Sequence, residues 1–254
     1  MTPEKFHSEL KVSFPFTPTT SQNKWFPEIT KFIFSKEKNN AFLLTGYAGT
    51  GKTTLIGSLV SQLKLTDYKA VLMAPTGRAA KVMSTYSKFS ARTIHKQIYY
   101  PKPESGGKMQ FQLKVNKFRK TIFIIDEASM IGDDRQNAKL FENGSLLHDV
   151  VQYVSTGDQC KLIFVGDPAQ LPPVHLNISP ALDLDELTQF HFDKVFSIQL
   201  DAVVRQAQGS GILHNATLLR NQLNNELYDS FKFDVIDYND ILYTNNGMDL
   251  FEAI

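Results

Sequence analysis

The sequence predicts an α/β protein built on a doubly wound, mainly parallel β-sheet with an inserted β-hairpin. Short apolar runs alternate with helical patterns, and each run ends in a Gly, Pro or Asp cluster. The four runs are Ala41–Thr45, Ala70–Ala74, Thr121–Ile125 and Lys161–Val165. Alternating strands and helices form right-handed crossovers and a parallel sheet. Because ligands bind at the carboxyl ends of such strands, we expect one site assembled from the four segments that follow these runs.

Residues 97–115 interrupt this alternation. Gln97–Tyr100 and Met109–Val115 are β-like segments, and Pro101–Lys108 between them contains Pro, Ser and a Gly-Gly pair. Gly and Pro at such positions are typical of a chain reversal. We therefore expect an inserted hairpin over residues 97–115.

The rest of the chain is expected to form one domain. Residues 1–96 and 116–254 would build the α/β lobe around the hairpin. Apolar residues from Ile212 to Leu223 recur at helical spacing and predict a helix. After Phe231 no regular structure is predicted, and Asp234–Asp240 is expected to be a loop or a partly ordered tail.

Composition indicates a soluble globular protein without a membrane partner. Of the 254 residues 42% are hydrophobic, and no stretch approaches the roughly 18 apolar residues of a membrane span. Glu4, Glu9 and Lys11 near the N-terminus are not typical of a signal peptide. The single cysteine, Cys160, excludes an internal disulfide and a Cys-based zinc site. A reduced, cytoplasmic location is the simplest expectation.

Charge is unevenly distributed along the chain. The segment Lys64–Lys120 contains 13 Lys or Arg residues against only Asp67 and Glu104, whereas the residues from Thr121 onward contain 7 basic and 20 acidic side chains. The folded molecule should therefore present one basic and one acidic region. A solvated lysine-rich surface and a nucleic-acid surface both fit this distribution.

A phosphate-binding loop follows the first predicted strand. Gly46-Tyr47-Ala48-Gly49-Thr50-Gly51-Lys52-Thr53 matches G-x-x-x-x-G-K-[ST] and precedes a helical pattern over Thr54–Gln62. Its backbone N–H groups and the helix N-terminus suit phosphate, so the expected cofactors are ATP and Mg²⁺. Lys52 would reach the β- and γ-phosphates, and Thr53 would ligate Mg²⁺. The expected nucleotide contacts are Gly46, Ala48, Gly49, Thr50, Gly51, Lys52, Thr53 and Thr54.

Two adjacent acids end the third predicted strand. Asp126 would hold Mg²⁺ directly or through water, and Glu127 would orient and deprotonate the attacking water. Acids in this place can also cap the following turn. Beside a P-loop the hydrolytic interpretation is favoured.

Seven segments resemble, in order, the motifs of superfamily 1 helicases of the RecD-like and Dda-like branch. They are Thr20–Gln22 (Q motif), Gly46–Thr53 (I), Ala74–Lys81 (Ia), Thr93–His95 (Ib), Asp126–Ser129 (II), Gly166–Pro173 (III) and Val204–Gln206 (IV). Members of this branch translocate 5′ to 3′ on single-stranded DNA. The resemblance covers residues from about Phe16 to Leu223 and implies a RecA-like P-loop NTPase lobe.

The resemblance assigns further roles at the nucleotide. Gln22 would hydrogen-bond the adenine, Gln170 would sense the γ-phosphate, and Arg205 would act as an arginine finger. The implied catalytic residues are Lys52, Glu127, Gln170 and Arg205. A helix-capping role for Gln22, turn chemistry at Gln170 and a surface position for Arg205 remain open alternatives.

The resemblance also implies a nucleic-acid surface. The residues expected to grip the backbone are Pro75, Thr76, Arg78, Lys81, Thr93 and His95. The inserted hairpin occupies the position of the pin that meets the duplex fork, with Tyr99, Tyr100 and Phe111 as candidates for stacking or packing. Turn residues at Thr93 and His95, and a solvated helix face at Arg78 and Lys81, are the alternatives.

The expected function is that of an ATP hydrolase, the first motor lobe of a DNA helicase. The partners expected from the resemblance are single-stranded and fork DNA, a second RecA-like lobe and a repair or recombination complex. About 50 residues follow Arg205, too few for a second lobe, so the lobe alone should unwind little or no DNA. An RNA helicase or remodeller, and a nucleotide-gated binding module without turnover, remain alternatives.

Overall fold

The computed structural model describes the following residues: 1–103, 109–132, 141, 143–190, 192–202, 210–224, 231–236 and 238–241. The chain divides into two compact units, Met1–Val204 and Arg205–Ile254. The expected single lobe, residues 1–96 and 116–254, spans both of these units and stays a prediction.

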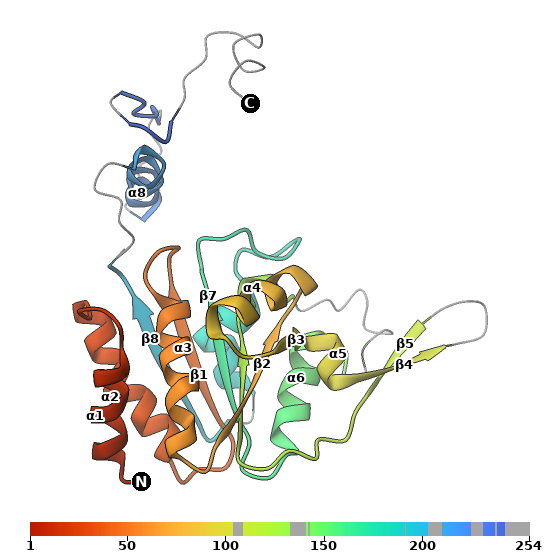
Figure 1. Cartoon of the computed structure of the whole chain (residues 1–254). Coiled ribbons are helices and arrows are strands. Elements are labelled where there is room, and N and C mark those ends of the chain that lie inside the picture. The colour runs from red at the N-terminus through yellow and green to blue at the C-terminus, as the bar shows by residue number, and fades with distance from the viewer. Residues whose placement is uncertain are drawn as a thin grey trace. The chain divides into compact units, whose positions relative to one another are not determined.

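A six-stranded sheet forms the centre of the first unit, and all its strand pairings are parallel. Its order is β3-β2-β6-β7-β1-β8 (Figure 1). The strands are β1 (Asn40–Gly46), β2 (Lys69–Ala74), β3 (Ala91–Thr93), β6 (Thr121–Ile125), β7 (Lys161–Gly166) and β8 (Lys194–Leu200). The four predicted runs are the central strands β2, β6, β7 and β1. The edge strands β3 and β8 were not predicted.

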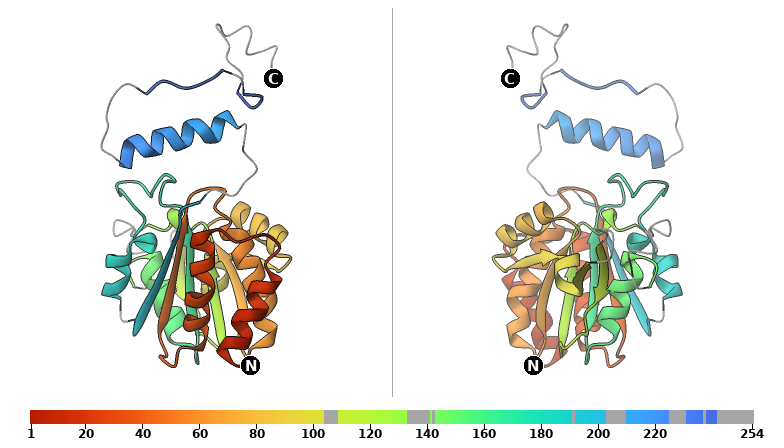
Figure 2. Two further views of the ribbon diagram at one scale, coloured as in Figure 1. Left: turned by 90° about the vertical axis from the view of Figure 1, so that its left-hand side faces the viewer. Right: turned by 90° about the vertical axis from the view of Figure 1, so that its right-hand side faces the viewer.

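Helices cover both faces of the sheet, so the doubly wound architecture is confirmed (Figures 1 and 2). Because side chains alternate along a strand, each strand supplies both faces. Phe42 and Leu44 belong to one buried cluster, and Leu43 between them belongs to the other. The helices of the first cluster are α1 (Pro3–Ser13), α2 (Thr20–Phe34), α3 (Lys52–Gln62) and α4 (Gly77–Ser87). The second cluster packs α5 (Ile94–Ile98), α6 (Leu146–Ser155) and α7 (Leu184–Gln189).

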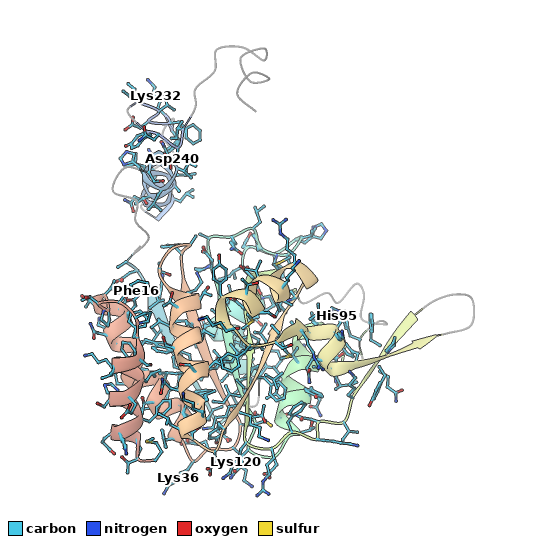
Figure 3. The ribbon with its side chains drawn as sticks, in the orientation of Figure 1. Phe16, Lys36, His95, Lys120, Lys232 and Asp240 are labelled. Atoms are coloured by element: carbon cyan, nitrogen blue, oxygen red, sulfur yellow. The ribbon has the colours of Figure 1, made fainter. Side chains whose placement is uncertain are left out.

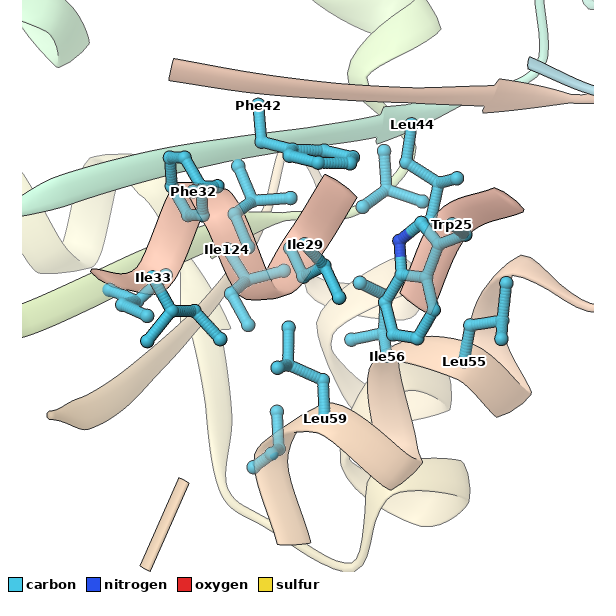
Figure 4. Close-up of a cluster of buried hydrophobic side chains, with 14 of the residues drawn as sticks. Trp25, Ile29, Phe32, Ile33, Phe42, Leu44, Leu55, Ile56, Leu59 and Ile124 are labelled. Atoms are coloured by element: carbon cyan, nitrogen blue, oxygen red, sulfur yellow. The ribbon is translucent and has the colours of Figure 1, made fainter. Parts of the chain in front are cut away.

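The first cluster is rich in aromatic side chains. Trp25 and Phe32 of α2 are fully buried against β1 and α3, where Phe42 and Leu59 lie (Figure 4). The rings of Phe32 and Phe42 meet edge to face, with centroids 5.5 Å apart. Aromatic groups in this geometry add stabilisation beyond their buried area. This packing fixes α2 and α3 on the same face of the sheet, and both helices reach the candidate site.

A buried lysine closes the C-terminal end of α2. Lys161, the first residue of β7, is 2% exposed. Its Nζ donates hydrogen bonds to the carbonyl oxygens of Phe32, Ile33 and Ser35 at 2.7, 3.1 and 3.0 Å. The last carbonyl groups of a helix have no partner within the helix and carry the negative end of its dipole. Lys161 therefore satisfies the end of α2 from a neighbouring strand.

The inserted hairpin is present, with different bounds from those expected. It consists of β4 (Tyr99–Pro103) and β5 (Met109–Leu113), paired antiparallel as a separate two-stranded sheet that projects beside the main one (Figure 1). Gln97 is helical, because residues 94–98 form α5 and Thr93 caps it. The β-like segment expected from Gln97 thus starts two residues later.

The second unit contains α8 (Gly211–Asn224), which confirms the predicted helix. Asp240 accepts hydrogen bonds from Ser210 Oγ and Gly211 N at 2.5 and 2.8 Å, which ties residues near Asp240 to the start of α8. The described residues after Phe231 form no helix or strand, as expected. Across the described part of both units, no helix is long and apolar enough to cross a membrane.

Candidate nucleotide site and adjoining surfaces

The P-loop joins the end of β1 to the start of α3. Gly49 and Gly51 both have positive φ, 82° and 89°, which allows the loop to turn back toward the helix. Gly51 is the N-cap of α3, and no side chain caps this helix. By contrast, Thr19 and Thr76 cap the neighbouring helices α2 and α4. Uncapped N–H groups at a helix N-terminus suit the phosphates of a nucleotide, so this loop fits the group that its sequence implies.

Lys52 lies folded against the loop itself. Its Nζ donates to the carbonyl oxygens of Gly46 and Tyr47 at 2.5 and 3.0 Å. Burial lowers the pKa of Lys52, and the carboxylates of Asp167, Asp126 and Glu127 partly offset this effect. The ammonium is thus held at the loop, within the field of acids from two other strand ends.

Gln22 connects α2 to the P-loop. It is 2% exposed, and its Nε2 donates to the carbonyl oxygen of Thr50 at 2.9 Å. Its Oε1 accepts from the backbone N–H of Thr19 at 3.0 Å, which completes a capping box at the start of α2. The capping alternative is therefore what the structure shows. The adenine contact stays a prediction, for which the amide retains one donor hydrogen and one acceptor lone pair.

Gly51→Ala should lower both the free energy of unfolding and the affinity for nucleotide. A Cβ at Gly51 would lie 2.6 Å from Gln22 Nε2, at a φ of +89° that side chains rarely adopt. A non-Gly residue in this conformation costs about 1–3 kcal/mol. The matched control is Gly57→Ala in α3, where a Cβ meets nothing within 4 Å and helix stability should rise by about 0.5–1 kcal/mol. Titration with a fluorescent ATP analogue and urea unfolding measure both effects, and equal affinity in the two variants would contradict the loop argument.

Two acids follow the end of β6, and one strand, β7, lies between β6 and β1. Burial raises the pKa of Asp126 to about 6, and the Glu127 N–H donates to its Oδ1 at 3.0 Å. Glu127 has a φ of 57°, in the left-handed region that non-glycine residues seldom occupy. Such strain is concentrated at functional sites, where it fixes the direction of a side chain. The turn η2 (Ala128–Met130) follows directly.

Gln170 is bonded to the segment that carries these acids. Ser129 Oγ donates to Gln170 Oε1 at 2.8 Å. The turn that presents Gln170 is held by Asp167, whose Oδ1 accepts from Ala169 N at 2.9 Å and whose carbonyl accepts from Gln170 N at 3.2 Å. The Ser129–Gln170 hydrogen bond therefore joins the segment after β6 to the segment after β7.

Among the described residues, His, Cys, Asp and Glu side chains form no cluster that could hold a metal ion by itself. Mg²⁺ in nucleotide sites usually takes one or two protein ligands and completes its shell with phosphate oxygens and water. Thr53, exposed at the start of α3, and Asp126 fit this sparse donor set. The residues present are therefore suited to magnesium that arrives with a triphosphate.

The predicted backbone-gripping residues lie on two short helices after β2 and β3. Thr76 caps α4 and Thr93 caps α5, each through its Oγ1 at 3.2 Å from a backbone N–H. Arg78 and Lys81 are exposed on α4, and Pro75 precedes it. The two threonines thus have a structural role as helix caps, and their contact with nucleic acid stays a prediction.

Base stacking by Tyr99 is not supported, and this expectation is corrected. Tyr99 is 2% exposed, because its ring packs against His95 and Phe111 with centroids 5.7 and 5.3 Å apart. Phe111 is half-buried in the same cluster, which gives it a packing role. Tyr100 is instead 60% exposed, and Lys114 Nζ lies 5.1 Å from its ring centroid.

A family model described as an AAA domain matches residues 32–232, most of the chain. The chain belongs to this AAA domain family. Its P-loop, its parallel sheet and its flanking helices are those expected of a P-loop NTPase.

Two helicases are similar to this AAA domain. The ATP-dependent RecD2 DNA helicase of Deinococcus radiodurans is 29% identical over 174 residues, which cover 68% of this chain and 21% of that protein. The ATP-dependent DNA helicase dda of Enterobacteria phage T4 is 30% identical over 208 residues, or 80% and 42% of the two chains. These matches confirm a superfamily 1 RecA-like lobe of the RecD-like and Dda-like branch.

One of the solved structures similar to this chain is only a distant match. A chain from the structure of Drosophila ORC bound to DNA has a TM-score of 0.37 and 15% identity, over 88% of this chain and 52% of that one, which is too distant to inform the fold. The AAA domain spans less than half the length of the curated relatives it matches.

Some residues of this AAA domain lie outside the earlier predictions or outside the described structure. Arg205, the expected arginine finger, falls outside the described residues. Asp167 and Ser129 were given no role, although both directly support Gln170. Asp167 directly follows β7, a strand of six buried residues, and this position at a strand end could have indicated a role at the site.

Proposed function

We propose that this AAA domain is the ATP-binding first motor lobe of a DNA helicase, which couples ATP hydrolysis to movement along single-stranded DNA. One observation carries the proposal: β1, β7 and β6 are adjacent parallel strands, so Lys52, Asp167 and the pair Asp126–Glu127 follow strand ends at one edge of the sheet. A hydrolytic site needs a phosphate cation, a metal anchor and a base together. Lys52, Asp126 and Glu127 would supply these three groups.

Each residue has a defined task in this proposal. Lys52 exchanges its two loop carbonyls for the β- and γ-phosphates, and the uncapped N–H groups of α3 bind the same anion. Thr53 and Asp126 would hold magnesium, which supplies charge neutralisation on the phosphate oxygens when bound. Glu127 orients and deprotonates the attacking water, and Gln170 senses the γ-phosphate. Arg205 would stabilise the developing charge.

The nucleic-acid track is proposed to cross the surface of α4 and α5 toward the hairpin. Arg78 and Lys81 are exposed there, and 13 of the 27 Lys and Arg residues lie between Lys64 and Lys120. Phosphate contacts from such residues bind without regard to sequence, as a translocating motor requires. The β4–β5 hairpin would meet the duplex fork. Fork DNA, a second RecA-like lobe and a repair or recombination complex are the proposed partners.

The proposal is tested by stimulation of ATP turnover in a protein that carries this lobe together with a second RecA-like lobe. Single-stranded DNA should raise the steady-state rate more than RNA of the same sequence and length. Lys52→Ala serves as the background control, because it removes the phosphate cation and should abolish the stimulated rate. Stronger stimulation by RNA would replace the DNA assignment with the RNA helicase alternative.

A nucleotide-gated binding module without turnover is the alternative from another class. Such a module binds ATP and nucleic acid but has no use for a strained carboxylate next to the metal anchor. The left-handed backbone of Glu127 therefore favours an enzyme. Nucleotide binding with no turnover in the two-lobe protein, with and without DNA, would decide for the module.

A further inference from the structure

Asp149 is a fully buried carboxylate at some distance in sequence from every motif described above. It lies in the first turn of α6 and is 0% exposed. Its Oδ1 accepts from the backbone N and side-chain Nδ2 of Asn143 at 2.8 and 2.7 Å. Its Oδ2 accepts from the phenolic hydroxyl of Tyr99 at 2.6 Å. A carboxylate removed from water requires such donors, because burial without them is very costly.

The Tyr99 hydroxyl brings the hairpin into this network. Tyr99 is the first residue of β4 and pairs with Leu113 of β5, so it stands at the base of the hairpin. Its ring also contacts His95, the last residue of the Thr93–His95 segment, and Figure 3 shows His95 beside that base. Phe111 of β5 lies 5.3 Å from the His95 ring, centroid to centroid. One aromatic cluster therefore joins α5 to both hairpin strands.

The hairpin needs such an anchor. It forms its own two-stranded sheet, separate from the six-stranded one, and an isolated two-stranded hairpin is only marginally stable in water. Ring packing resists separation but allows rings to slide past one another. A short hydrogen bond from a hydroxyl to a carboxylate is both strong and directional. The Tyr99–Asp149 contact therefore fixes the angle of the hairpin as well as its attachment.

We propose that Tyr99 and Asp149 are positioning residues, which hold the β4–β5 hairpin at a fixed angle to the nucleic-acid track by tying its base to α6. This inference rests on the proposed function, in which the hairpin meets the duplex fork. Asp149 is fully buried and acts on the hairpin through the Tyr99 hydroxyl. The pair makes the hairpin and the His95 segment move with the ATPase lobe as one body.

Tyr99→Phe tests the pair with little disturbance, because it removes one oxygen and keeps the ring in its cluster. In the two-lobe protein, unwinding of a forked duplex should fall about tenfold, in line with the loss of a hydrogen bond to a charged group. ATP turnover stimulated by single-stranded DNA should remain within about twofold of wild type, because the P-loop and α4 are unchanged. Tyr68→Phe is the matched control, because it also removes one hydroxyl from a partly buried ring, which packs against the first buried cluster and not beside the hairpin, and it should leave both rates unchanged.

A second measurement follows the anchor directly in this chain. Hydrogen exchange of the β4 and β5 amides should accelerate in Tyr99→Phe, whereas exchange in α3 should not. Full unwinding by Tyr99→Phe, or a parallel loss of unwinding and stimulated ATP turnover, would overturn the positioning role. If wild type itself fails to unwind or to respond to DNA, the proposed function fails instead; faster exchange confined to the hairpin would still support the anchor.

Discussion

Glu127→Gln should reduce ATP turnover by about 10²–10⁴-fold, the usual contribution of a positioned general base, while nucleotide affinity stays close to wild type. The amide keeps the size and hydrogen-bonding shape of the carboxylate but cannot accept the proton of the attacking water. In the proposed site, the nucleotide binds to Lys52 and to the N-terminus of α3, neither of which the substitution changes. Single-turnover hydrolysis in the two-lobe protein, beside titration with a fluorescent ATP analogue, separates chemistry from binding.

The local geometry provides the control for this experiment. Glu127 and Asp126 are adjacent, but only Asp126 is expected at the metal. Asp126→Asn should therefore weaken magnesium-dependent nucleotide binding as well as turnover, whereas Glu127→Gln should leave binding intact. If Glu127→Gln retains turnover within about tenfold, Glu127 is not the base. If both variants lose nucleotide binding equally, the assignment of Asp126 to magnesium and of Glu127 to the attacking water is wrong.

The central sheet and the P-loop could be predicted because their signals are local. β6 and β7 are runs of buried residues, and the glycines of the loop are fixed in sequence relative to Lys52. The edge strands were missed for a physical reason. β3 has only three residues, and β8 mixes Lys194, Ser197 and Gln199 with apolar residues because one of its edges is free in this sheet.

Tyr99 shows where the sequence could not distinguish two roles. An aromatic residue at the base of a hairpin is equally consistent with stacking on a base and with packing in a core. His95 and Phe111 pack against the ring, and its hydroxyl is bound by Asp149, which lies 50 residues further along the chain and reaches Tyr99 only through the tertiary fold. Gln22 is a similar case, since its partner Thr50 is 28 residues away. Long-range partners of this kind are not encoded in local spacing.

Lys161→Met should lower the free energy of unfolding by about 2–4 kcal/mol at pH 7, because three carbonyl groups at the end of α2 lose their donor. Two effects oppose each other here. Each orphaned buried carbonyl costs about 1–3 kcal/mol, whereas removing a buried charge relieves a desolvation penalty. Three lost partners outweigh one relieved charge. Urea unfolding of this chain measures the difference, and Lys194→Met on the exposed face of β8 is the control.

The difference in the free energy of unfolding between wild type and Lys161→Met should also depend on pH, because the Lys161 amine is buried. Burial lowers the pKa of Lys161 from 10.5 to about 8. Between these two values the unfolded chain holds the proton and the folded chain has released it, so the free energy of unfolding of wild type should rise with pH across this window. Each pKa unit corresponds to about 1.4 kcal/mol, so the rise approaches about 3 kcal/mol. Lys161→Met lacks this titrating amine, and the contributions of all other titrating groups cancel when the two proteins are compared. The gap between wild type and variant should therefore widen from pH 8 to 10.5; a constant or narrowing gap would mean that Lys161 keeps an ordinary pKa in the fold.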